Sequence, residues 1–269
     1  MSLNTAIEWT DNTWNPVRGC TKCSAGCTHC YAYAFAERFR GVPGHPFEQG
    51  FDLRLAPWKL MEPLHWSTPS FVFVNSMSDL FHEDVPDSYI VSIFGVMAQV
   101  DWHVYQVLTK RADRMQRMIG KQLKFAAGLE HIWWGVTAEN RKQGLPRVEA
   151  LRNSDVAMRF LSCEPLLEDL GRVSLKGIDW VIAGGESGRE ARPIQKKWVI
   201  SLRDQCAAVE VPFFFKQWGG YPKAKFGSEL DGKLYKARPK VPELTPRSLS
   251  ERRAIEAKLQ AGYDLKRIA

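Results

Sequence analysis

The chain has 269 residues, of which 45% are hydrophobic, so it is long enough for one large α/β domain or two small ones. Its net charge is +7, and the excess is uneven, because residues 219–269 hold twelve Lys or Arg against six Asp or Glu. We see no leader peptide and no long apolar stretch. The sequence therefore argues against a membrane protein and predicts a cytoplasmic one.

Hydrophobic strands alternate with helical patterns from about residue 30 to residue 216. The expected strands are a short one near residues 52–55, then Phe71–Val74, Val104–Leu108, His131–Val136, Ala157–Leu161, Trp180–Ala183 and Pro212–Phe215. The expected helices are Tyr31–Arg40, one from Pro57, Pro86–Val100, Ala112–Leu123, Gly144–Arg152, Gln195–Val209 and Ser250–Gln260.

This alternation predicts parallel βαβ units in an α/β fold. Six or seven such units would form a partial or full TIM-like barrel, and a doubly wound open sheet is the alternative. We expect residues 1–218 to form the barrel with an N-terminal cysteine loop. Residues 219–269 would be a basic C-terminal extension with a terminal helix.

Four of the six cysteines fall within eleven residues, at Cys20, Cys23, Cys27 and Cys30. Such a cluster in a reducing compartment is typical of a zinc or iron–sulfur site and not of disulfides. Both Cys23-x3-Cys27-x2-Cys30 and Cys20-x6-Cys27-x2-Cys30 offer three ligands for a [4Fe–4S] cube whose fourth iron stays open. The two Cys-x2-Cys pairs lie too close together for ordinary structural zinc, which ranks second, and a cube closed by all four cysteines ranks third.

Polar residues follow the expected strands, at the end where the ligand site of a parallel barrel lies. The candidate site residues are Asn75, Ser76, Ser78, Asp79, Thr109, Lys110, Glu139, Asn140, Glu164, Gly184, Gly185, Glu186 and Lys216. Cys163 is a further candidate as a hydrogen-atom donor, and a buried inert thiol is the alternative.

The residues around the cysteines resemble the spore photoproduct lyase-like branch of the radical S-adenosylmethionine (SAM) enzymes. That branch carries Asn-Pro-x-x-Gly-Cys-x3-Cys-x2-Cys-Tyr-Ala, and this chain has Asn15-Pro16-Val17-Arg18-Gly19-Cys20 followed by Cys27-x2-Cys30-Tyr31-Ala32. Three more residues separate the first two motif cysteines here, and Cys23 is extra. The resemblance implies Cys20, Cys27 and Cys30 as ligands of the cluster and leaves the role of Cys23 open.

Several segments, taken in order, resemble the phage gene-product 37/68 family over residues 5–220. They are NPVRGC, GCTHCYA, FVNSMSDLFHEDVP, YQVLTKR, RFLSCEPLL, VIAGGESGREARP and PFFFKQWG. The resemblance implies a barrel of radical SAM type, a [4Fe–4S] cluster, SAM and an external electron donor. It also implies a "three-Cys-motif partner" protein, but no settled substrate.

In such an enzyme SAM presents an amino group, a carboxylate, ribose hydroxyls and adenine. We expect Ser78 and Asp79 to bind the amino group, and Lys110 or Arg111 to bind the carboxylate. Glu139 and Asn140 would bind the ribose, and Gly184 with Gly185 would let the backbone approach adenine. Reductive cleavage of SAM would give a 5′-deoxyadenosyl radical that abstracts a hydrogen atom from the substrate.

By analogy with the spore photoproduct lyase-like branch, the substrate would be a nucleic acid, and the reaction would be lesion repair or base modification. The extension supports this, because aromatic residues that can stack on bases lie among basic residues that can bind phosphates. These residues are Tyr221, Lys223, Lys225, Phe226, Lys233, Tyr235, Lys236, Arg238 and Lys240. A solvated connector is the other reading of the extension. The alternative function is a non-enzymatic nucleic-acid-binding protein with a four-cysteine zinc or closed iron–sulfur site.

Overall fold

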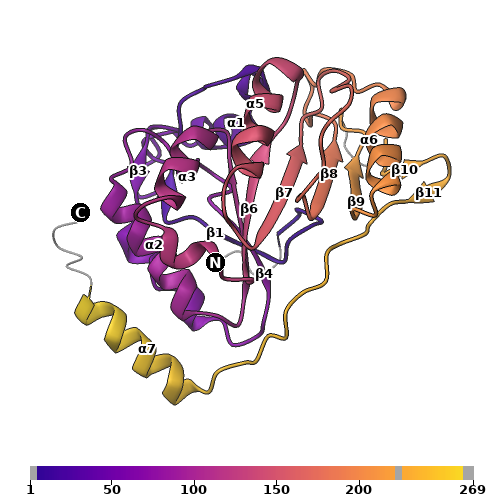
Figure 1. The fold of residues 1–269 in the computed structure, drawn as a ribbon. Helices are drawn as coiled ribbons and strands as arrows, with labels where there is room; N and C mark the ends of the chain where they lie inside the picture. The colour runs from indigo at the N-terminus through magenta and orange to yellow at the C-terminus, as the bar shows by residue number, and fades with distance from the viewer. Residues whose placement is uncertain (1–4, 222–225, 263–269) are drawn as a thin grey trace.

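The computed structural model describes residues 5–221 and 226–262, which contain a seven-stranded parallel sheet in the order β1-β4-β5-β6-β7-β8-β9 (Figure 1). The strands are β1 (Asn12–Trp14), β4 (Phe71–Val74), β5 (Val104–Thr109), β6 (Ile132–Thr137), β7 (Met158–Cys163), β8 (Trp180–Gly184) and β9 (Phe213–Gln217). The strand order follows the chain, as in a barrel, whereas a doubly wound sheet reverses its order at a switch point. Within the described residues the edge strands β1 and β9 do not pair, so the sheet is a half-barrel and not a closed barrel.

The helices are α1 (Tyr31–Glu37), α2 (Asp87–Gln99), α3 (Ala112–Ile119), α4 (Lys124–Ala127), α5 (Arg141–Arg152), α6 (Lys196–Ala208) and α7 (Leu249–Gly262). Two short antiparallel ladders accompany the sheet, β2 (Val17–Arg18) with β3 (Arg54–Leu55) and β10 (Glu229–Leu230) with β11 (Lys233–Leu234). The helix expected from Pro57 is only a 3₁₀ turn, Pro57–Lys59. None of the helices in the described ranges is long and apolar enough to cross a membrane.

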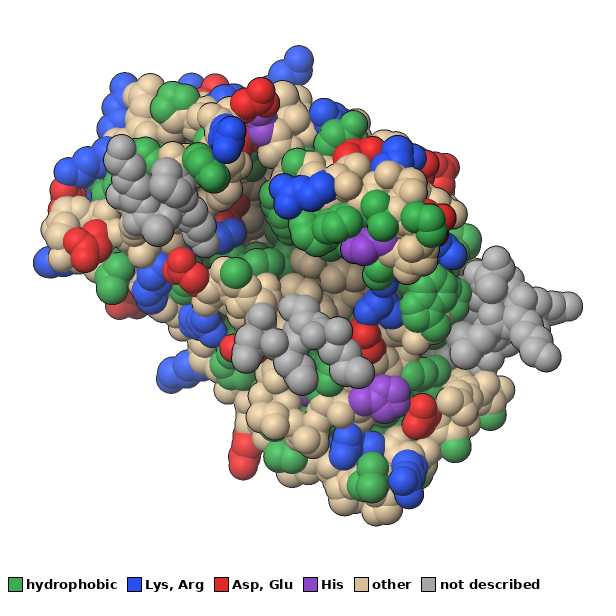
Figure 2. Space-filling model, turned by 180° about the vertical axis from the view of Figure 1, so that it is seen from behind, with side chains coloured by type: hydrophobic (Ala, Val, Ile, Leu, Met, Phe, Trp, Pro, Cys, Tyr) green, Lys and Arg blue, Asp and Glu red, His purple; other side chains and the backbone are tan. Residues whose placement is uncertain are grey.

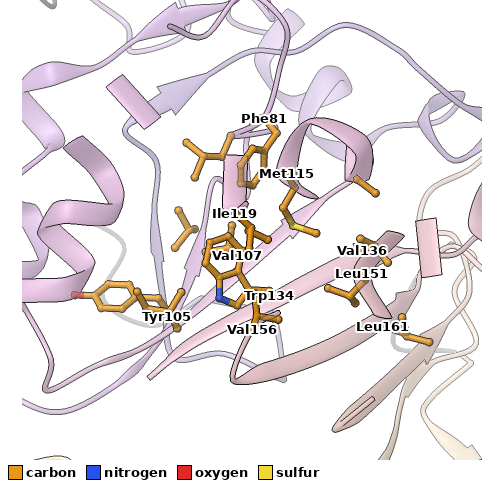
Figure 3. Close-up of a cluster of buried hydrophobic side chains, with 14 of the residues drawn as sticks. Phe81, Tyr105, Val107, Met115, Ile119, Trp134, Val136, Leu151, Val156 and Leu161 are labelled. Atoms are coloured by element: carbon orange, nitrogen blue, oxygen red, sulfur yellow. The ribbon is translucent and has the colours of Figure 1, made fainter. Parts of the chain in front are cut away.

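Two hydrophobic layers cover the two faces of the sheet, because successive side chains of a strand point to opposite faces. Trp134 belongs to the outer layer, where it stacks on Phe94 of α2 with ring centroids 4.7 Å apart. Figure 3 shows part of this layer between the sheet and its helices. Trp133, the preceding residue, lies on the inner face, 5.8 Å from the ring of Trp180. Large rings thus fill the inner face, and the pocket described below lies at the C-terminal ends of the strands.

The C-terminal extension packs back on the half-barrel. Lys236 forms an isolated antiparallel bridge with Phe214 of β9, and the indole of Trp180 donates to the carbonyl of Ala237 at 2.9 Å. Arg238 then donates to the carbonyl of Glu8 at 2.7 Å. The chain continues to α7, which lies beyond α2 in Figure 1. Lys223 and Lys225 of the expected basic surface lie outside the described residues.

Candidate functional site

The cysteine loop connects β2 to α1 and is fixed at its start by backbone contacts. The Gly19 amide donates to the carbonyl of Met77 at 3.0 Å, and the Cys20 amide donates to that of Phe51 at 3.2 Å. Gly19 has a φ of +76°, and a Cβ at this position would overlap the carbonyl oxygen of Asp52. Only glycine combines that backbone conformation with so close an approach. The loop therefore leaves β2 in one defined direction.

All four clustered cysteines are free thiols that line one pocket. Cys20, Cys27 and Cys30 are half-buried, and Cys23 is exposed. Burial, and then the carboxylate of Asp79, raises the pKa of Cys20 to about 11. A hydrogen bond from Cys23 lowers the pKa of Cys27 and raises that of Cys23, because the shared proton stays on the donor. The loop thus places a set of soft donors on one wall.

Arg111 brings a positive charge against this wall. Its Nη1 lies 3.5 Å from Sγ of Cys20 and 4.0 Å from Sγ of Cys23. Its Nη2 donates to the hydroxyl of Thr21 at 3.0 Å. A guanidinium in this position stabilises negative charge on sulfur. Arg111 is therefore engaged by the cysteine loop.

Asp79 is surrounded by donors of the chain itself. Its Oδ1 accepts from the Phe81 amide at 3.0 Å and from the Thr109 hydroxyl at 2.7 Å. Its Oδ2 accepts from the Lys110 amide at 3.0 Å and from Nη1 of Arg111 at 3.2 Å. Two oxygens that accept four hydrogen bonds have little capacity left. Asp79 thus braces the strand ends behind the cysteines, which differs from the expected contact with the amino group of SAM.

The pocket gathers many of the polar residues expected at the strand ends. Those that line it are Asn75, Ser76, Ser78, Asp79, Thr109, Lys110, Glu164 and Lys216, together with Arg111, Thr137 and Ser162. In the same pocket, Nζ of Lys216 lies 2.9 Å from Oε1 of Glu164, and Ser162 donates to the other oxygen of Glu164 at 3.3 Å. A charged pair and a thiol cluster therefore share one pocket.

Asn75 is unusual among the lining residues. It is 2% exposed, and neither its Oδ1 nor its Nδ2 has a hydrogen-bond partner among the described residues. Its φ of +59° is left-handed, a region that non-glycine residues visit rarely and that asparagine tolerates best. Buried amides are almost always satisfied in folded proteins, so an unpartnered one in a pocket wall points to a ligand.

The remaining candidates do not line the pocket. The carboxylate of Glu139 is buried and pairs with Arg147 at 2.6 Å, although its Oε1 finds no hydrogen-bond partner in the described ranges. Asn140 caps α5 by accepting from the amide of Gln143 at 2.8 Å. Glu186 pairs with Arg192 at 2.6 Å. All three side chains thus have partners within the chain, whereas Glu139 and Asn140 were expected to contact the ribose of SAM.

Gly184 and Gly185 also have structural reasons to be glycine. A Cβ on Gly184 would come within 3.0 Å of Oε1 of Glu164, and one on Gly185 would overlap the carbonyl of Trp218. Both glycines thus allow the ends of β7, β8 and β9 to approach one another. No contact with adenine is needed to explain them.

Cys163 is fully buried in the outer hydrophobic layer and does not line the pocket. Its neighbours Ser162 and Glu164 do line it, because alternate residues of β7 face opposite sides. Burial raises the pKa of the Cys163 thiol. The core position of Cys163 favours the alternative of a buried inert thiol, and its role as a hydrogen-atom donor stays a prediction.

One supporting residue was not anticipated from the sequence. Arg192 donates from Nη2 to the carbonyl of Ala25 in the cysteine loop at 3.0 Å, while it pairs with Glu186. Arg192 and Ala25 are 167 residues apart. No local pattern predicts such a contact, since it depends on how β8 is placed beside the loop.

Within residues 5–221 and 226–262, no group of three or more His, Cys, Asp or Glu side chains is placed to hold a single metal ion. Thiolates around one ion must converge on a point. The cysteines of a [4Fe–4S] cube bind different irons, so they need not converge in that way. The thiols on the pocket wall are soft donors of the kind that bind zinc or iron–sulfur centres.

The chain belongs to the family described as "Protein of unknown function (DUF5131)", whose model matches residues 4–239. The phage gene-product name expected from the motifs stays a prediction. No curated protein matches the chain.

Among solved structures, the chain resembles spore photoproduct lyase complexed with dinucleoside spore photoproduct, with a TM-score of 0.37 and 11% identity over 91% of this chain and 71% of that one. A mutant of spore photoproduct lyase gives a TM-score of 0.36 and 11% identity over 93% and 73%. At such scores neither likeness carries an argument about function.

Proposed function

We propose that this chain is an iron–sulfur enzyme that binds SAM in the cysteine pocket and cleaves it reductively. One observation carries the proposal: four thiols and the unpartnered amide of buried Asn75 line the same pocket. Soft thiolates fit an iron–sulfur cluster, and the amide fits a polar ligand beside it. Such a cluster, reduced by an external electron donor, would supply the electron for the reductive cleavage of SAM.

Cys20, Cys27 and Cys30 would hold the cluster. They are the half-buried thiols of the four, and their order agrees with the motif that the flanking residues resemble. Cys23 is the exposed thiol of the four, so it is the one that the site can best lose. The guanidinium of Arg111 would offset the negative charge of the thiolates.

Asn75 and Lys110 are the residues that we expect to meet SAM. The Asn75 amide can accept a hydrogen bond from an ammonium group through Oδ1 and donate one to a carboxylate through Nδ2. Nζ of Lys110, 3.3 Å from the Thr137 hydroxyl, brings a cation to the same wall. The Glu164–Lys216 pair, which lines the same pocket, would then face the rest of the ligand or the substrate.

Metal content tests the first half of the proposal. Purified without oxygen, the protein should contain about four iron and four sulfide per chain. Replacement of Cys20, Cys27 or Cys30 by Ala should each remove the iron, and Cys23→Ala should retain it. Zinc at one per chain without iron would contradict the proposal.

Asn75→Gly tests the second half. The change removes two unpartnered buried atoms and suits a φ of +59°, so the free energy of unfolding should rise by about 1–3 kcal/mol. Affinity for SAM, measured by calorimetry, should nevertheless fall about tenfold or more, with iron content unchanged.

The matched control is Glu210→Gly, because Glu210 has a φ of +57° and is exposed. It reports the backbone effect of glycine alone. If Asn75→Gly binds SAM as tightly as the unmodified protein does, Asn75 does not contact the ligand.

A second candidate function is a non-enzymatic protein with a four-cysteine zinc or closed iron–sulfur site. It is favoured by Cys23, which lines the same pocket and is hydrogen-bonded to Cys27. In that case Cys23→Ala should lower metal content as much as Cys27→Ala does. SAM should then leave the spectrum of the metal centre unchanged.

A further inference from the structure

Helix α1, directly after the last cysteine, is inverted relative to an ordinary surface helix. It buries the small residues Ala32 and Ala36, which are 3% and 0% exposed. It exposes the large rings of Tyr31, Tyr33 and Phe35, which are 54%, 43% and 43% exposed. A surface helix normally buries its largest apolar side chains. The exposed parts of these rings contribute little to folding, so this face is suited to a partner.

Basic side chains alternate with these rings. Nζ of Lys22 lies 5.0 Å from the ring centroid of Tyr33. Phe35 packs edge-on against Phe47 at 5.7 Å, and the guanidinium of Arg18 lies 5.4 Å from that second ring. Each cation therefore lies against an aromatic ring, which holds its positive charge near the exposed face of α1.

The pattern continues to a tryptophan. Trp58 is 62% exposed, with the guanidinium groups of Arg18 at 5.8 Å and Arg54 at 5.6 Å from its ring. We call the whole set the α1 surface. It consists of Arg18, Lys22, Tyr31, Tyr33, Phe35, Arg38, Phe47, Arg54 and Trp58.

Three carboxylates beside the α1 surface have basic partners. Oε2 of Glu190, which lines the groove against α1, lies 3.2 Å from Nδ1 of His29. Glu37 and Asp52 both bond to Arg40, at 2.6 Å and 3.0 Å. Their charges are thus offset locally, and exposed Arg38 and Lys22 add positive charge to the surface. A polyanion would be attracted to it.

The α1 surface is continuous with the cysteine pocket. A groove lined by Phe35 and Arg38 shares Lys22, Tyr31 and Tyr33 with that pocket. Figure 2, which views the molecule from behind, shows a hollow bordered by hydrophobic side chains with Lys and Arg side chains nearby. A ligand on α1 would therefore lie at the entrance to the pocket.

We propose that the α1 surface binds single-stranded nucleic acid and delivers an unpaired base to the cysteine pocket. Exposed rings accept stacked bases of any sequence, and the interleaved cations bind the backbone phosphates. A base held in a duplex could not reach the pocket without leaving its stack. A protein partner would use the rings but has no need of so many cations. The inference that the bound nucleic acid is the substrate rests on the proposed function. The inference that the α1 surface binds single-stranded nucleic acid does not.

Fluorescence anisotropy with labelled oligo(dT) and oligo(rU) of about twelve nucleotides tests the binding. The protein is used both with its iron and after iron removal, so that a failure of the surface is distinguished from a failure of the metal site. Both single strands should bind more tightly than a duplex of equal length. Tighter binding of oligo(dT) would identify the ligand as DNA, and tighter binding of oligo(rU) would identify it as RNA.

Tyr33→Ala and Phe35→Ala should each weaken binding by roughly five- to a hundredfold. Tyr33→Phe keeps the ring and should keep the affinity, which separates loss of stacking from loss of folding. Phe125→Ala is the matched control, because Phe125 is a 49% exposed ring on α4, and it should change nothing. Arg18→Gln should flatten the log–log dependence on salt by about 0.7.

Three results would overturn the proposal. The first is no binding of either oligonucleotide at low salt. The second is an equal loss with Phe125→Ala. The third is an α1 variant that dissociates a protein oligomer while oligonucleotide binding stays intact, which would make the α1 surface a protein interface.

Discussion

At the residue scale, a single carboxylate organises the wall behind the cysteines. Asp79 and Arg111 have side chains only 7% and 10% exposed, so their ion pair is shielded from water. The same carboxylate accepts from two backbone amides and from Thr109. Removal of Asp79 would leave two backbone amides and the Thr109 hydroxyl without their acceptor, and Arg111 with only the exposed carboxylate of Glu83 as its ion-pair partner among the described residues.

Asp79→Ala should therefore lower the free energy of unfolding by about 3–5 kcal/mol, measured by urea denaturation of the metal-free protein. Asp84→Ala is the comparison, because Asp84 is an exposed carboxylate in the same connection, and it should cost less than about 1 kcal/mol. An effect of Asp79→Ala confined to SAM affinity, with stability unchanged, would restore Asp79 as a ligand-binding residue.

At the element scale, the path from β2 through the loop to α1 is set by one glycine. Gly19 has a positive φ and touches the backbone next to β3, so it fixes the point from which the cysteines start. Gly41, after α1, has nearly the same φ of +78° with open space around it. Both glycines need a left-handed backbone, but only Gly19 also needs the absence of a Cβ. Comparing them therefore separates the cost of the backbone conformation from the cost of the overlap.

Gly41→Ala should cost about 1–2 kcal/mol, the penalty of a left-handed alanine. Gly19→Ala should cost that amount plus about 1–3 kcal/mol for the overlap with Asp52. Thermal unfolding of both variants measures the difference. Equal losses would mean that the backbone beside Gly19 yields without strain.

The fold could be predicted from the sequence to a considerable extent. The apolar runs of β4 to β9 are long enough to identify, and the edge that they share brought Asn75, Lys110, Glu164 and Lys216 into one pocket. The short edge strand β1 was missed, because Asn12–Trp14 has no apolar run. Whether a polar strand end faces a ligand or a structural partner depends on distant residues, as the pairing of Glu139 with Arg147 shows.

At the scale of the whole molecule, the basic extension binds back to the half-barrel and stabilises it. Nζ of Lys236 lies 2.7 Å from Oε2 of Glu8 and donates to the carbonyl of Phe215 at 2.9 Å. The guanidinium of Arg238 lies 5.1 Å from the ring of Phe71. These two cations connect the segments near both edges of the open sheet, so they have an intramolecular role.

The double variant Lys236→Gln, Arg238→Gln should lower the free energy of unfolding by about 1–3 kcal/mol, because hydrogen bonds and partly exposed ion pairs are lost. The salt dependence of oligonucleotide binding should stay the same. Exposed Lys233 and Lys240, changed together to Gln, form the control and should leave stability unchanged. A flatter salt dependence in the first variant would return phosphate binding to the extension.

The hydrogen bond from Arg192 to the carbonyl of Ala25 has a consequence for the order of events during biosynthesis. At about 5–20 residues per second, a ribosome needs on the order of ten to thirty seconds to make the 167 residues between them. The four thiols thus leave the ribosome well before the last brace of their loop exists. Metal delivered during synthesis would meet a flexible thiol-rich segment, and metal delivered afterwards would meet a formed pocket. For the proposed cluster, the timing of metal supply would therefore decide which of these two states it meets.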